Sequence, residues 1–406
     1  MAPSFSLIPE EGGFCLKILF LQDHRQAGGA ARAANRYAAV LGALGCQVAR
    51  VVGDESISAQ EVRVTGKPPR GWPRILEMLL GRKAKNRLRQ RRVAEGWLDF
   101  LFRMRPDLVW VHNLHGGAKW GWSEAMVATV PKALPVLWTL HDMWPLGRGR
   151  AFFGEKNLAE EFPRSPAAQE YLRRPSLVLT SPSRWLQEQV RTVHPGKCVH
   201  LPYVLDVDLF CPAGRATRRA ELGLRPGDLF FLAAAENLAD PRKRVSLLLS
   251  AWRKARAAFP GRRALLGLLG RNAPANGGED CRALGLVTDD HAMASFYAAA
   301  DLFLHVAEAE SFGQVLEESQ ACGTPVMTAL AGGTPETFLE GITGWGLAEP
   351  VVGCLDTRLS TVLARPDHLA SMRQPARELM LSRHGGGQFA NRWNELIREI
   401  RDEATG

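Results

Sequence analysis

The sequence predicts an α/β protein with two doubly wound parallel sheets, one in each half of the chain. Short apolar runs alternate with helical stretches, which is the pattern of strand–helix–strand units, and this pattern starts twice, near residues 16 and 229. The length of 406 residues suits two domains. A hydrophobic content of 46% and a charged content of 23% are ordinary for a soluble globular protein.

The first half opens with the apolar run LKILFL at 16–21, which predicts a buried strand. An Ala-rich helix follows up to about Gly45, and residues 48–52 predict the next strand. Gly28 and Gly29 stand where that helix begins. A glycine pair is typical of a tight turn, and also of a loop that a phosphate approaches. The GxGxxG dinucleotide fingerprint is absent, which disfavours a nicotinamide enzyme.

Two more buried strands lie within 106–117 and 134–145, and each ends in polar residues. His141 and Asp142 come directly after the second of these. Ligands of open α/β sheets bind at the carboxyl edge of the strands, so these side chains are candidates for a site. Residues 176–190 predict a further strand and helix, with Ser181 or Ser183 as the helix cap.

The second half repeats the pattern with strands at 229–235 and 264–270 and a helix at 245–255. Between the first strand and the helix lies ENLADPRKRV, which contains three consecutive cations at 242–244. This segment is either an anion site or a solvated surface turn. A strand end and a helix within 284–306 then lead to the stretch 301–325.

The stretch 301–325 combines a strand end, a loop and a short helix that stops at the Gly-Thr-Pro sequence 323–325. Near Gly313 the helix presents free backbone N–H groups, which suit a phosphate. Glu310 precedes the helix and Glu318 lies within it. The alternative is a surface helix with two solvated glutamates. The glycines at 332–333, near Thr334, are a second candidate for holding a phosphate.

Three motifs together resemble a known family. ESFG at 310–313, Glu318 and ACGTPV at 321–326 are similar to the paired-glutamate motif of the retaining glycosyltransferases of family 4. GGAARAA resembles the glycine loop of that family, and HDMWP at 141–145 resembles the segment that carries its catalytic-face histidine. The resemblance implies the GT-B fold, in which two Rossmann-like domains face a central cleft.

The resemblance also implies roles for single residues. Glu310 would face the transferred sugar, Glu318 would hold the nucleotide ribose, and Lys243 would hold a phosphate. Asn237 stands where relatives carry an arginine, and Arg242 or Arg244 would compensate. The expected catalytic residues are His141, Lys243 and Glu310. The expected substrate-binding residues are Gly28, Gly29, Asp142, Asn237, Arg242, Ser311, Phe312, Gly313, Glu318 and Thr334.

The implied domains are residues 1–206 for the acceptor and 207–385 for the nucleotide sugar, with 386–406 as a helix that packs back on the first domain. At the crossing, Tyr203 and Val204 replace the Asn-Gly of relatives, while Asp206 is kept. Residues 147–169 lack the Cys- and Gly-rich loop that many relatives have, so the acceptor does not follow by analogy.

The formal charge of +9 favours anionic partners. Residues 68–105 carry eleven Lys or Arg against three acids, beside apolar residues at helical spacing: Trp72, Ile75, Leu76, Leu79 and Leu80. This segment is either a peripheral contact with an anionic membrane or a domain helix with a solvated basic face. No recognition motif supports nucleic-acid binding.

The seven cysteines are scattered without a CxxC pair, which disfavours a zinc site or a disulfide framework and suits a reducing compartment. The N-terminus has no signal-peptide pattern, and no apolar run approaches the ~20 residues of a membrane span. We therefore expect a cytoplasmic protein, with peripheral attachment to the inner face of the cell membrane as an added option.

The sequence thus predicts a retaining, metal-independent glycosyltransferase. It would use a nucleoside-diphosphate sugar and no cofactor, and it would glycosylate a glycan or lipid-linked acceptor in polysaccharide, lipopolysaccharide or glycolipid synthesis. Two alternatives stay open at this point: an epimerase or hydrolase of nucleotide sugars on the same fold, and a catalytically silent nucleotide-sugar-binding protein.

Overall fold

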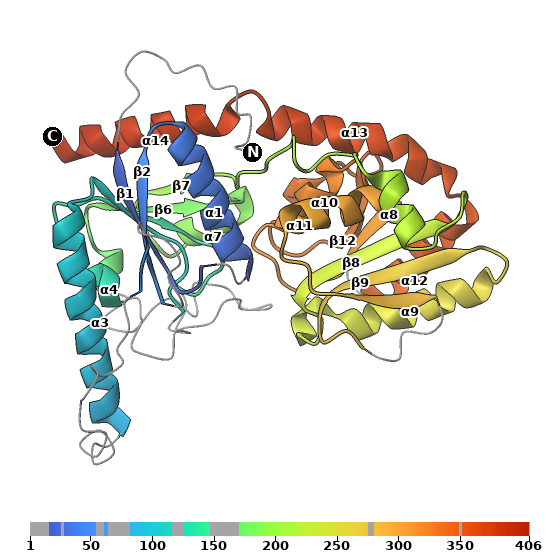
Figure 1. Cartoon of the computed structure of the whole chain (residues 1–406), viewed down its shortest axis with the longest axis horizontal. Helices are drawn as coiled ribbons and strands as arrows, with labels where there is room; N and C mark the ends of the chain where they lie inside the picture. Colours follow the sequence, from blue (N-terminus) through green and yellow to red (C-terminus); the bar gives the residue numbers. More distant parts are fainter. Residues whose placement is uncertain are drawn as a thin grey trace. The chain divides into compact units, whose positions relative to one another are not determined.

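The computed structural model describes residues 16–25, 28–53, 61–63, 82–115, 125–146, 170–274, 280–348 and 351–405. They form two compact units (Figure 1). The N-terminal unit contains the described residues up to Val204 together with those from Phe389 onward, and the C-terminal unit spans Leu205–Gln388. The boundaries expected from the sequence were 206 and 386. Each unit is a parallel sheet with helices, which confirms the predicted pair of Rossmann-like domains.

The N-terminal unit contains a seven-stranded sheet in the order β3-β2-β1-β4-β5-β6-β7. The strands are β1 Lys17–Gln22, β2 Gln47–Val52, β3 Glu61–Arg63, β4 Leu108–Val111, β5 Val136–Thr139, β6 Leu177–Ser181 and β7 Cys198–His200. The helices are α1 Gly28–Ala43, α3 Arg82–Met104, α4 Ala125–Ala128, α7 Arg184–Arg191 and α14 Gln388–Thr405. Ser183 caps α7 by accepting the Leu186 N–H at 3.1 Å, as one of the two predicted caps.

An aromatic cluster fixes α14 on this unit. Trp110 of β4 stacks on Trp393 of α14, with ring centroids 5.0 Å apart and an interplanar angle of 7°. Tyr37 of α1 packs against both Trp110 and Phe389. The other face of the sheet packs against Trp97 of α3 and against helices α4 and α7. Helices therefore cover both faces, as buried parallel sheets require.

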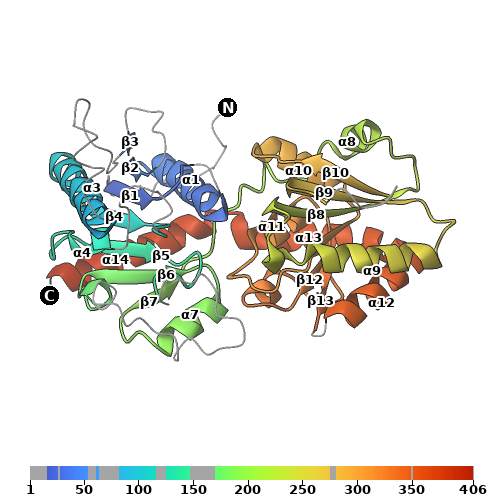
Figure 2. The ribbon, with the colours of Figure 1, turned by 90° about the horizontal axis from the view of Figure 1, so that it is seen from below.

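The C-terminal unit contains a six-stranded sheet in the order β10-β9-β8-β11-β12-β13 (Figure 2). The strands are β8 Leu229–Asn237, β9 Ala264–Arg271, β10 Cys281–Gly285, β11 Leu302–His305, β12 Val326–Ala329 and β13 Gly344–Leu347. The α-helices are α8 Arg215–Glu221, α9 Val245–Ala258, α10 Asp290–Ala299, α11 Gln314–Ala321, α12 Val351–Ala364 and α13 Asp367–His384. Two 3₁₀ turns, η1 Pro241–Lys243 and η2 Thr334–Thr337, follow β8 and β12.

The alternation of side chains along β8 shows how this sheet is buried. Phe231 and Ala233 belong to the core formed with α9 and α12, whereas Phe230 and Leu232 belong to the core formed with α10 and α11. Successive residues of a strand point to opposite faces, so a run such as LFFLA is buried on both sides. This explains why the predicted strands at 16–21, 48–52, 229–235 and 264–270 are all confirmed.

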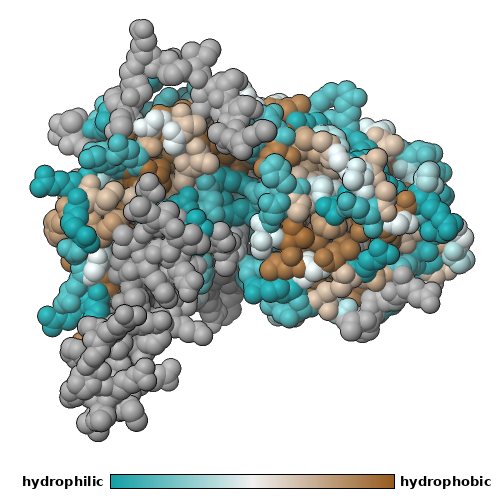
Figure 3. All heavy atoms as spheres, in the orientation of Figure 1, coloured by the Kyte–Doolittle hydropathy of each residue, from teal (hydrophilic) through white to brown (hydrophobic). Residues whose placement is uncertain are grey.

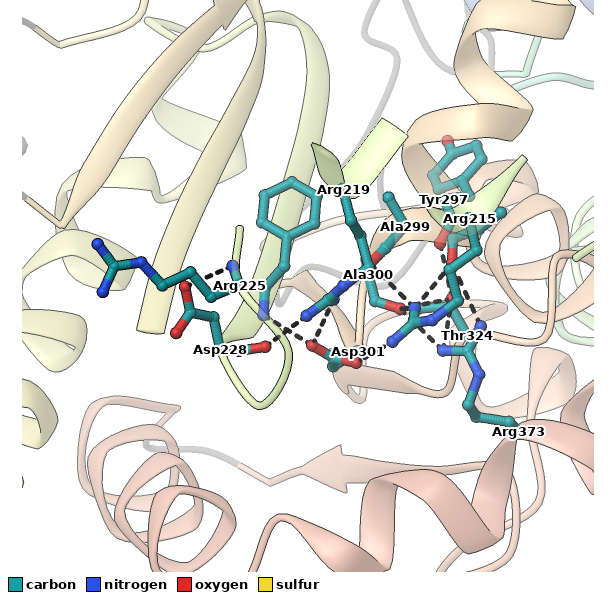
Figure 4. A network of polar contacts seen from close by, with 12 residues as sticks. Arg215, Arg219, Arg225, Asp228, Tyr297, Ala299, Ala300, Asp301, Thr324 and Arg373 are labelled. Carbon is teal, nitrogen blue, oxygen red and sulfur yellow. Dashed lines mark hydrogen bonds and ion pairs between the residues drawn. The ribbon is translucent and has the colours of Figure 1, made fainter. Parts of the chain in front are cut away.

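A polar network locks the start of β11 to its neighbours (Figure 4). Asp301 pairs with Arg215 and with Arg219, and it accepts the Phe230 N–H at 2.8 Å. Arg373 of α13 donates to the Ala300 carbonyl at 2.8 Å. The network satisfies carbonyls that the end of α10 leaves free. It lies at the amino end of β11, away from the edge where ligands bind in such sheets.

Helix α3 is basic at its start and apolar further on. Val93, Trp97 and Leu101 are buried in the N-terminal core, so this half is an ordinary domain helix. The apolar residues that motivated a membrane contact, Trp72, Ile75, Leu76, Leu79 and Leu80, lie outside the described residues. Within the described part of the chain, no helix is long and apolar enough to span a membrane.

The described surface mixes polar and apolar side chains, as the face in Figure 3 shows. The exposed large hydrophobic side chains are Phe102, Leu286, Leu330, Leu339, Ile342 and Leu381. Such exposed apolar side chains are normal on a folded protein.

Candidate functional site

The turn that follows β8 positions the predicted phosphate-binding cations. Asp240 caps η1 by accepting the Arg242 N–H at 3.0 Å, and its carboxylate also pairs with the Arg242 guanidinium at 2.6 Å. Arg242 is thus held against its own turn. Lys243 instead points to the loop after β11. Arg244 adopts a left-handed backbone (φ 48°) before α9, and its guanidinium lies 3.7 Å from the Glu308 carboxylate.

Lys243 and Glu310 form the centre of the site in the C-terminal unit. Lys243 Nζ donates to Glu310 Oε2 at 3.1 Å, and His305 Nε2 lies 3.5 Å from the same oxygen. Burial alone would raise the pKa of Glu310, but Lys243 and His305 together hold it well below its ordinary value. Glu310 is therefore an ionised carboxylate at neutral pH. It meets Lys243 because the loops after β8 and β11 lie at the same edge of the sheet.

The loop after β12 is hydrogen-bonded to the backbone of this site. The Gly333 N–H donates to the Glu310 carbonyl at 3.2 Å. Thr334 is fully buried, and its hydroxyl donates to the Ala329 carbonyl at 2.7 Å and accepts the Ala331 N–H at 3.0 Å. In this structure Thr334 shapes the loop, and its expected contact with substrate stays a prediction.

Gly313 is the residue at which the chain turns from the loop into α11. Its φ of 100° favours glycine, and a Cβ placed there would lie 2.8 Å from Leu316 Cδ1. Among the described residues, no side chain caps the amino end of α11, and the positive end of a helix dipole suits an anion. The side chains of Ser311 and Phe312 are buried, so any ligand contact from them comes from the backbone.

Glu318 lies inside the unit. Its side chain is fully buried, and Glu318 Oε2 accepts the Tyr297 hydroxyl at 3.0 Å. Neighbouring Glu317 pairs with Arg383 at 3.2 Å and with His384 at 2.9 Å. Glu318 is fully buried and Glu310 is largely buried against Lys243, so the alternative of a surface helix with two solvated glutamates is wrong. The ribose contact of Glu318 stays a prediction.

Asn237 ends β8 in the place where an arginine was expected. Its side-chain oxygen accepts the Ala239 N–H at 3.1 Å and the Asn272 amide at 2.9 Å. Asn237 thus ties the ends of β8 and β9 together. Among the cations at 242–244, Lys243 is the one that pairs with Glu310, whereas Arg242 pairs with Asp240.

His141 lies at the carboxyl edge of the sheet in the N-terminal unit. Its Nδ1 is 2.9 Å from the Tyr203 hydroxyl and its Nε2 is 3.2 Å from His112 Nδ1. Burial lowers the pKa of His141 to about 4; Asp142 opposes this shift, and His115 adds to it. His141 is therefore neutral at pH 7, with both ring nitrogens held by protein groups.

His115, after β4, joins the loops after three strands through contacts with Asp142 and Asp23. His115 Nε2 lies 2.9 Å from Asp142 Oδ2, and the Trp144 N–H donates to Asp142 Oδ1 at 2.9 Å. Asp23, after β1, accepts the His115 N–H at 2.7 Å. Gly28, with φ 85°, opens α1 after the same strand, followed by Gly29.

Several of these partners have no signal in the sequence. Four of these partners contact the predicted residues only because the fold brings distant segments together. They are His112 and His115 after β4, Tyr203 in the crossing segment, and His305 at the end of β11. The polar residues after β4 were the one available hint. Within the described ranges, no group of three or more His, Cys, Asp or Glu side chains is arranged to hold a metal ion.

Two family models match the chain. Residues 27–209 match the model described as Glycosyltransferase Family 4, and residues 216–379 match the model described as Glycosyl transferases group 1. The two matches together include all the predicted site residues, from Gly28 to Thr334.

Curated relatives match over part of their length. The chain is 31% identical over 195 residues to a D-inositol 3-phosphate glycosyltransferase of Segniliparus rotundus, covering 45% of this chain and 43% of the relative. It is 34% identical over 209 residues to the protein of that name from Saccharomonospora viridis, covering 47% of this chain and 46% of the relative. The chain thus spans a little under half the length of these relatives.

Solved structures show the same fold. Sucrose-phosphate synthase of Thermosynechococcus elongatus aligns with a TM-score of 0.71 at 19% identity, covering 95% of this chain and 99% of that one. Anabaena HepE, solved in complex with UDP-glucose, aligns with a TM-score of 0.70 at 18% identity, covering 95% of this chain and 100% of that one. At such identities the likeness concerns the fold, which is the GT-B architecture.

Proposed function

We propose that this chain, which belongs to the glycosyltransferases of group 1 and family 4, transfers a sugar from a nucleoside diphosphate to an acceptor hydroxyl. The observation that carries this proposal is the contact between Lys243 and Glu310 beside the uncapped amino end of α11. A cation, an ionised carboxylate and the amino end of a helix at one sheet edge suit a glycosyl diphosphate.

The charges fit the chemistry of the leaving group. When the bond between the anomeric carbon and the phosphate oxygen breaks, negative charge grows on the diphosphate. Lys243 and the N–H groups of α11 would stabilise that charge, as preorganised donors do in a transition state. Positive character grows on the sugar at the same time, and the Glu310 carboxylate would stabilise it. Departure and attack on one face of the sugar would retain the anomeric configuration without a protein nucleophile.

We assign a nucleoside-diphosphate sugar as donor, with neither metal nor cofactor. Support for this donor comes from the fold shared with HepE, which was solved with UDP-glucose. The acceptor would be a glycan or lipid-linked hydroxyl bound by the N-terminal unit. The relatives named D-inositol 3-phosphate glycosyltransferases supply one phosphorylated polyol to try.

Exchange of Lys243 tests the donor site. Lys243→Ala should cut turnover of UDP-glucose by ~10²–10³-fold, because it removes one preorganised charge from the site where charge develops. Lys254→Ala is the matched control, since Lys254 is exposed on α9 and pairs with Asp356, away from Glu310. Asn237→Ala should matter far less than Lys243→Ala. Calorimetry with UDP-glucose and steady-state kinetics would measure both effects.

Near-normal turnover of Lys243→Ala would contradict the assignment of the phosphate site. Donor consumption that needs no acceptor would favour a hydrolase or epimerase. Tight donor binding without turnover on any acceptor would favour a silent binding protein.

We further propose a peripheral contact with anionic membrane, at the cytoplasmic face, through the basic start of α3 and the segment before it. Each well-placed Lys or Arg contributes about 1 kcal/mol of attraction to anionic lipid. Sedimentation with phosphatidylserine vesicles should show binding at low salt that is lost at high salt. Absence of binding at low salt would eliminate this contact and leave the transfer reaction untouched.

A further inference from the structure

The Glu310 carboxylate has two supports within the C-terminal unit, and the fold holds them with different firmness. Lys243 Nζ lies 3.1 Å from Glu310 Oε2, and His305 Nε2 lies 3.5 Å from the same oxygen. Lys243 comes from the short turn η1, and its side chain is 29% exposed. His305 is the last residue of β11, and its side chain is 5% exposed. One support is thus a long side chain on a turn, and the other is a buried ring on a strand.

The neighbouring strand fixes the His305 ring. His305 and Thr328 are register partners in the parallel pair of β11 and β12. His305 Nδ1 lies 3.2 Å from Thr328 Oγ1, and Thr328 is fully buried. The two ring nitrogens therefore face two polar groups, the hydroxyl of the next strand on one side and the Glu310 carboxylate on the other.

The Glu310 carboxylate needs such a support. Burial raises the pKa of Glu310, whereas Lys243 and then His305 lower it below its ordinary value, so the carboxylate is ionised. A largely buried carboxylate without hydrogen-bond donors would be strongly destabilised. A neutral imidazole with its proton on Nε2 and a protonated imidazole both donate from that nitrogen, so the support does not depend on the charge of the ring.

The proposed reaction gives Lys243 a second task, which is to stabilise the leaving diphosphate. A lysine ammonium has three donors on a flexible four-carbon stem, so a phosphate can draw it away from a carboxylate. A Glu310 that depended on Lys243 alone would lose its partner while positive character grows on the sugar. The His305 ring stays in place, because it is buried at a strand end and held by Thr328.

We propose that His305 is a positioning residue, which keeps the Glu310 carboxylate in place while Lys243 engages the phosphates of the donor. This inference rests on the proposed glycosyl transfer. His305 acts through Glu310 and takes no part in making or breaking bonds. A histidine that only filled space in the core would need no ring nitrogen directed at the carboxylate.

Two variants of His305 test this role. Leucine fills the core without a donor, whereas the amide of glutamine can still donate to Glu310. With UDP-glucose and D-inositol 3-phosphate, His305→Leu should lower kcat by about 10- to 100-fold, the effect of losing one hydrogen bond to a charged group. The Kd for UDP-glucose should stay within about twofold, and His305→Gln should recover most of kcat. His291→Gln, at an exposed position of α10, is the matched control and should behave as wild type.

A double-mutant cycle separates positioning from a structural role. If His305 acts through Glu310, adding His305→Leu to Glu310→Gln should lower kcat by less than about twofold further. A structural role would instead lower the melting temperature and reduce turnover by the same factor in both backgrounds.

The inference would be overturned if His305→Leu turned over within about twofold of wild type, or if its full loss persisted in the Glu310→Gln background. Failure of His305→Gln to recover kcat would overturn it too, as would a joint fall in donor affinity and melting temperature in His305→Leu. In each of these cases turnover by wild type leaves the proposed function standing. If wild type consumes neither UDP-glucose nor any other nucleotide sugar with an acceptor, the proposed function fails and this inference fails with it.

Discussion

At the scale of single residues, Glu310 and Glu318 share one motif but lie in different surroundings. Glu310 Oε2 lies on the Lys243 ammonium at the sheet edge, whereas Glu318 is enclosed between α10 and α11 beside Tyr297. Glu310→Gln should therefore lower kcat more than donor affinity, because its charge matters most when the sugar becomes cationic. Glu318→Gln should mainly weaken the donor affinity by disturbing α11. Kinetics together with calorimetric donor affinities would separate the two effects.

Equal losses of donor affinity with unchanged kcat in both variants would contradict this division of roles. A variant that also lowers the melting temperature must be compared at matched folded fraction, which matters most for Glu318 because its carboxylate is fully buried.

The sequence was informative about single residues where a local motif carried the signal. Lys243 and Glu310 were predicted separately, and the structure brings them within 3.1 Å. Their partner His305 could not be predicted, because the contact arises from strand order rather than from spacing. The same is true of His115, which reaches Asp142 only because β4 and β5 are neighbours in the sheet.

At the scale of elements, Asp301 ties α8 to the start of β11 and to β8 (Figure 4). Asp301 is bound by Arg215 and Arg219, and its side chain is 13% exposed. Asp301→Asn should lower the free energy of unfolding by about 3 kcal/mol, because it leaves largely buried guanidinium groups without their counter-charge. Urea denaturation followed by tryptophan fluorescence would measure the loss.

Glu221→Gln is the control for Asp301→Asn. Glu221 pairs with Arg218 on the surface of α8, with a side chain that is 55% exposed, so its loss should cost no more than about 0.5 kcal/mol. Equal effects of the two variants would contradict a special role of the Asp301 network.

Elements with a strong apolar period were predictable, and those governed by tertiary contacts were not. The strands at 16–21 and 264–270 are uninterrupted apolar runs, and both form. Helix α13 carries Pro375 inside it, and its placement depends on arginines that reach α10 and α11. Strand β3 has three residues and no distinguishing pattern.

At the scale of the whole molecule, each unit gathers polar side chains at the carboxyl edge of its own sheet. The C-terminal unit gathers Lys243, Glu310 and the amino end of α11 at one sheet edge. The N-terminal unit gathers His141, Asp142 and His115 at the edge of its own sheet. The charge of +9 over the chain fits anionic substrates.

A proton NMR time course tests the central claim most directly. The chain would be mixed with UDP-glucose and D-inositol 3-phosphate, and the anomeric signals of donor and product would be followed together. The account predicts that donor is consumed only when acceptor is present, and that the product has the anomeric configuration of the donor. Consumption without acceptor, an inverted product, or no consumption with this or any other nucleotide sugar and acceptor pair would contradict it.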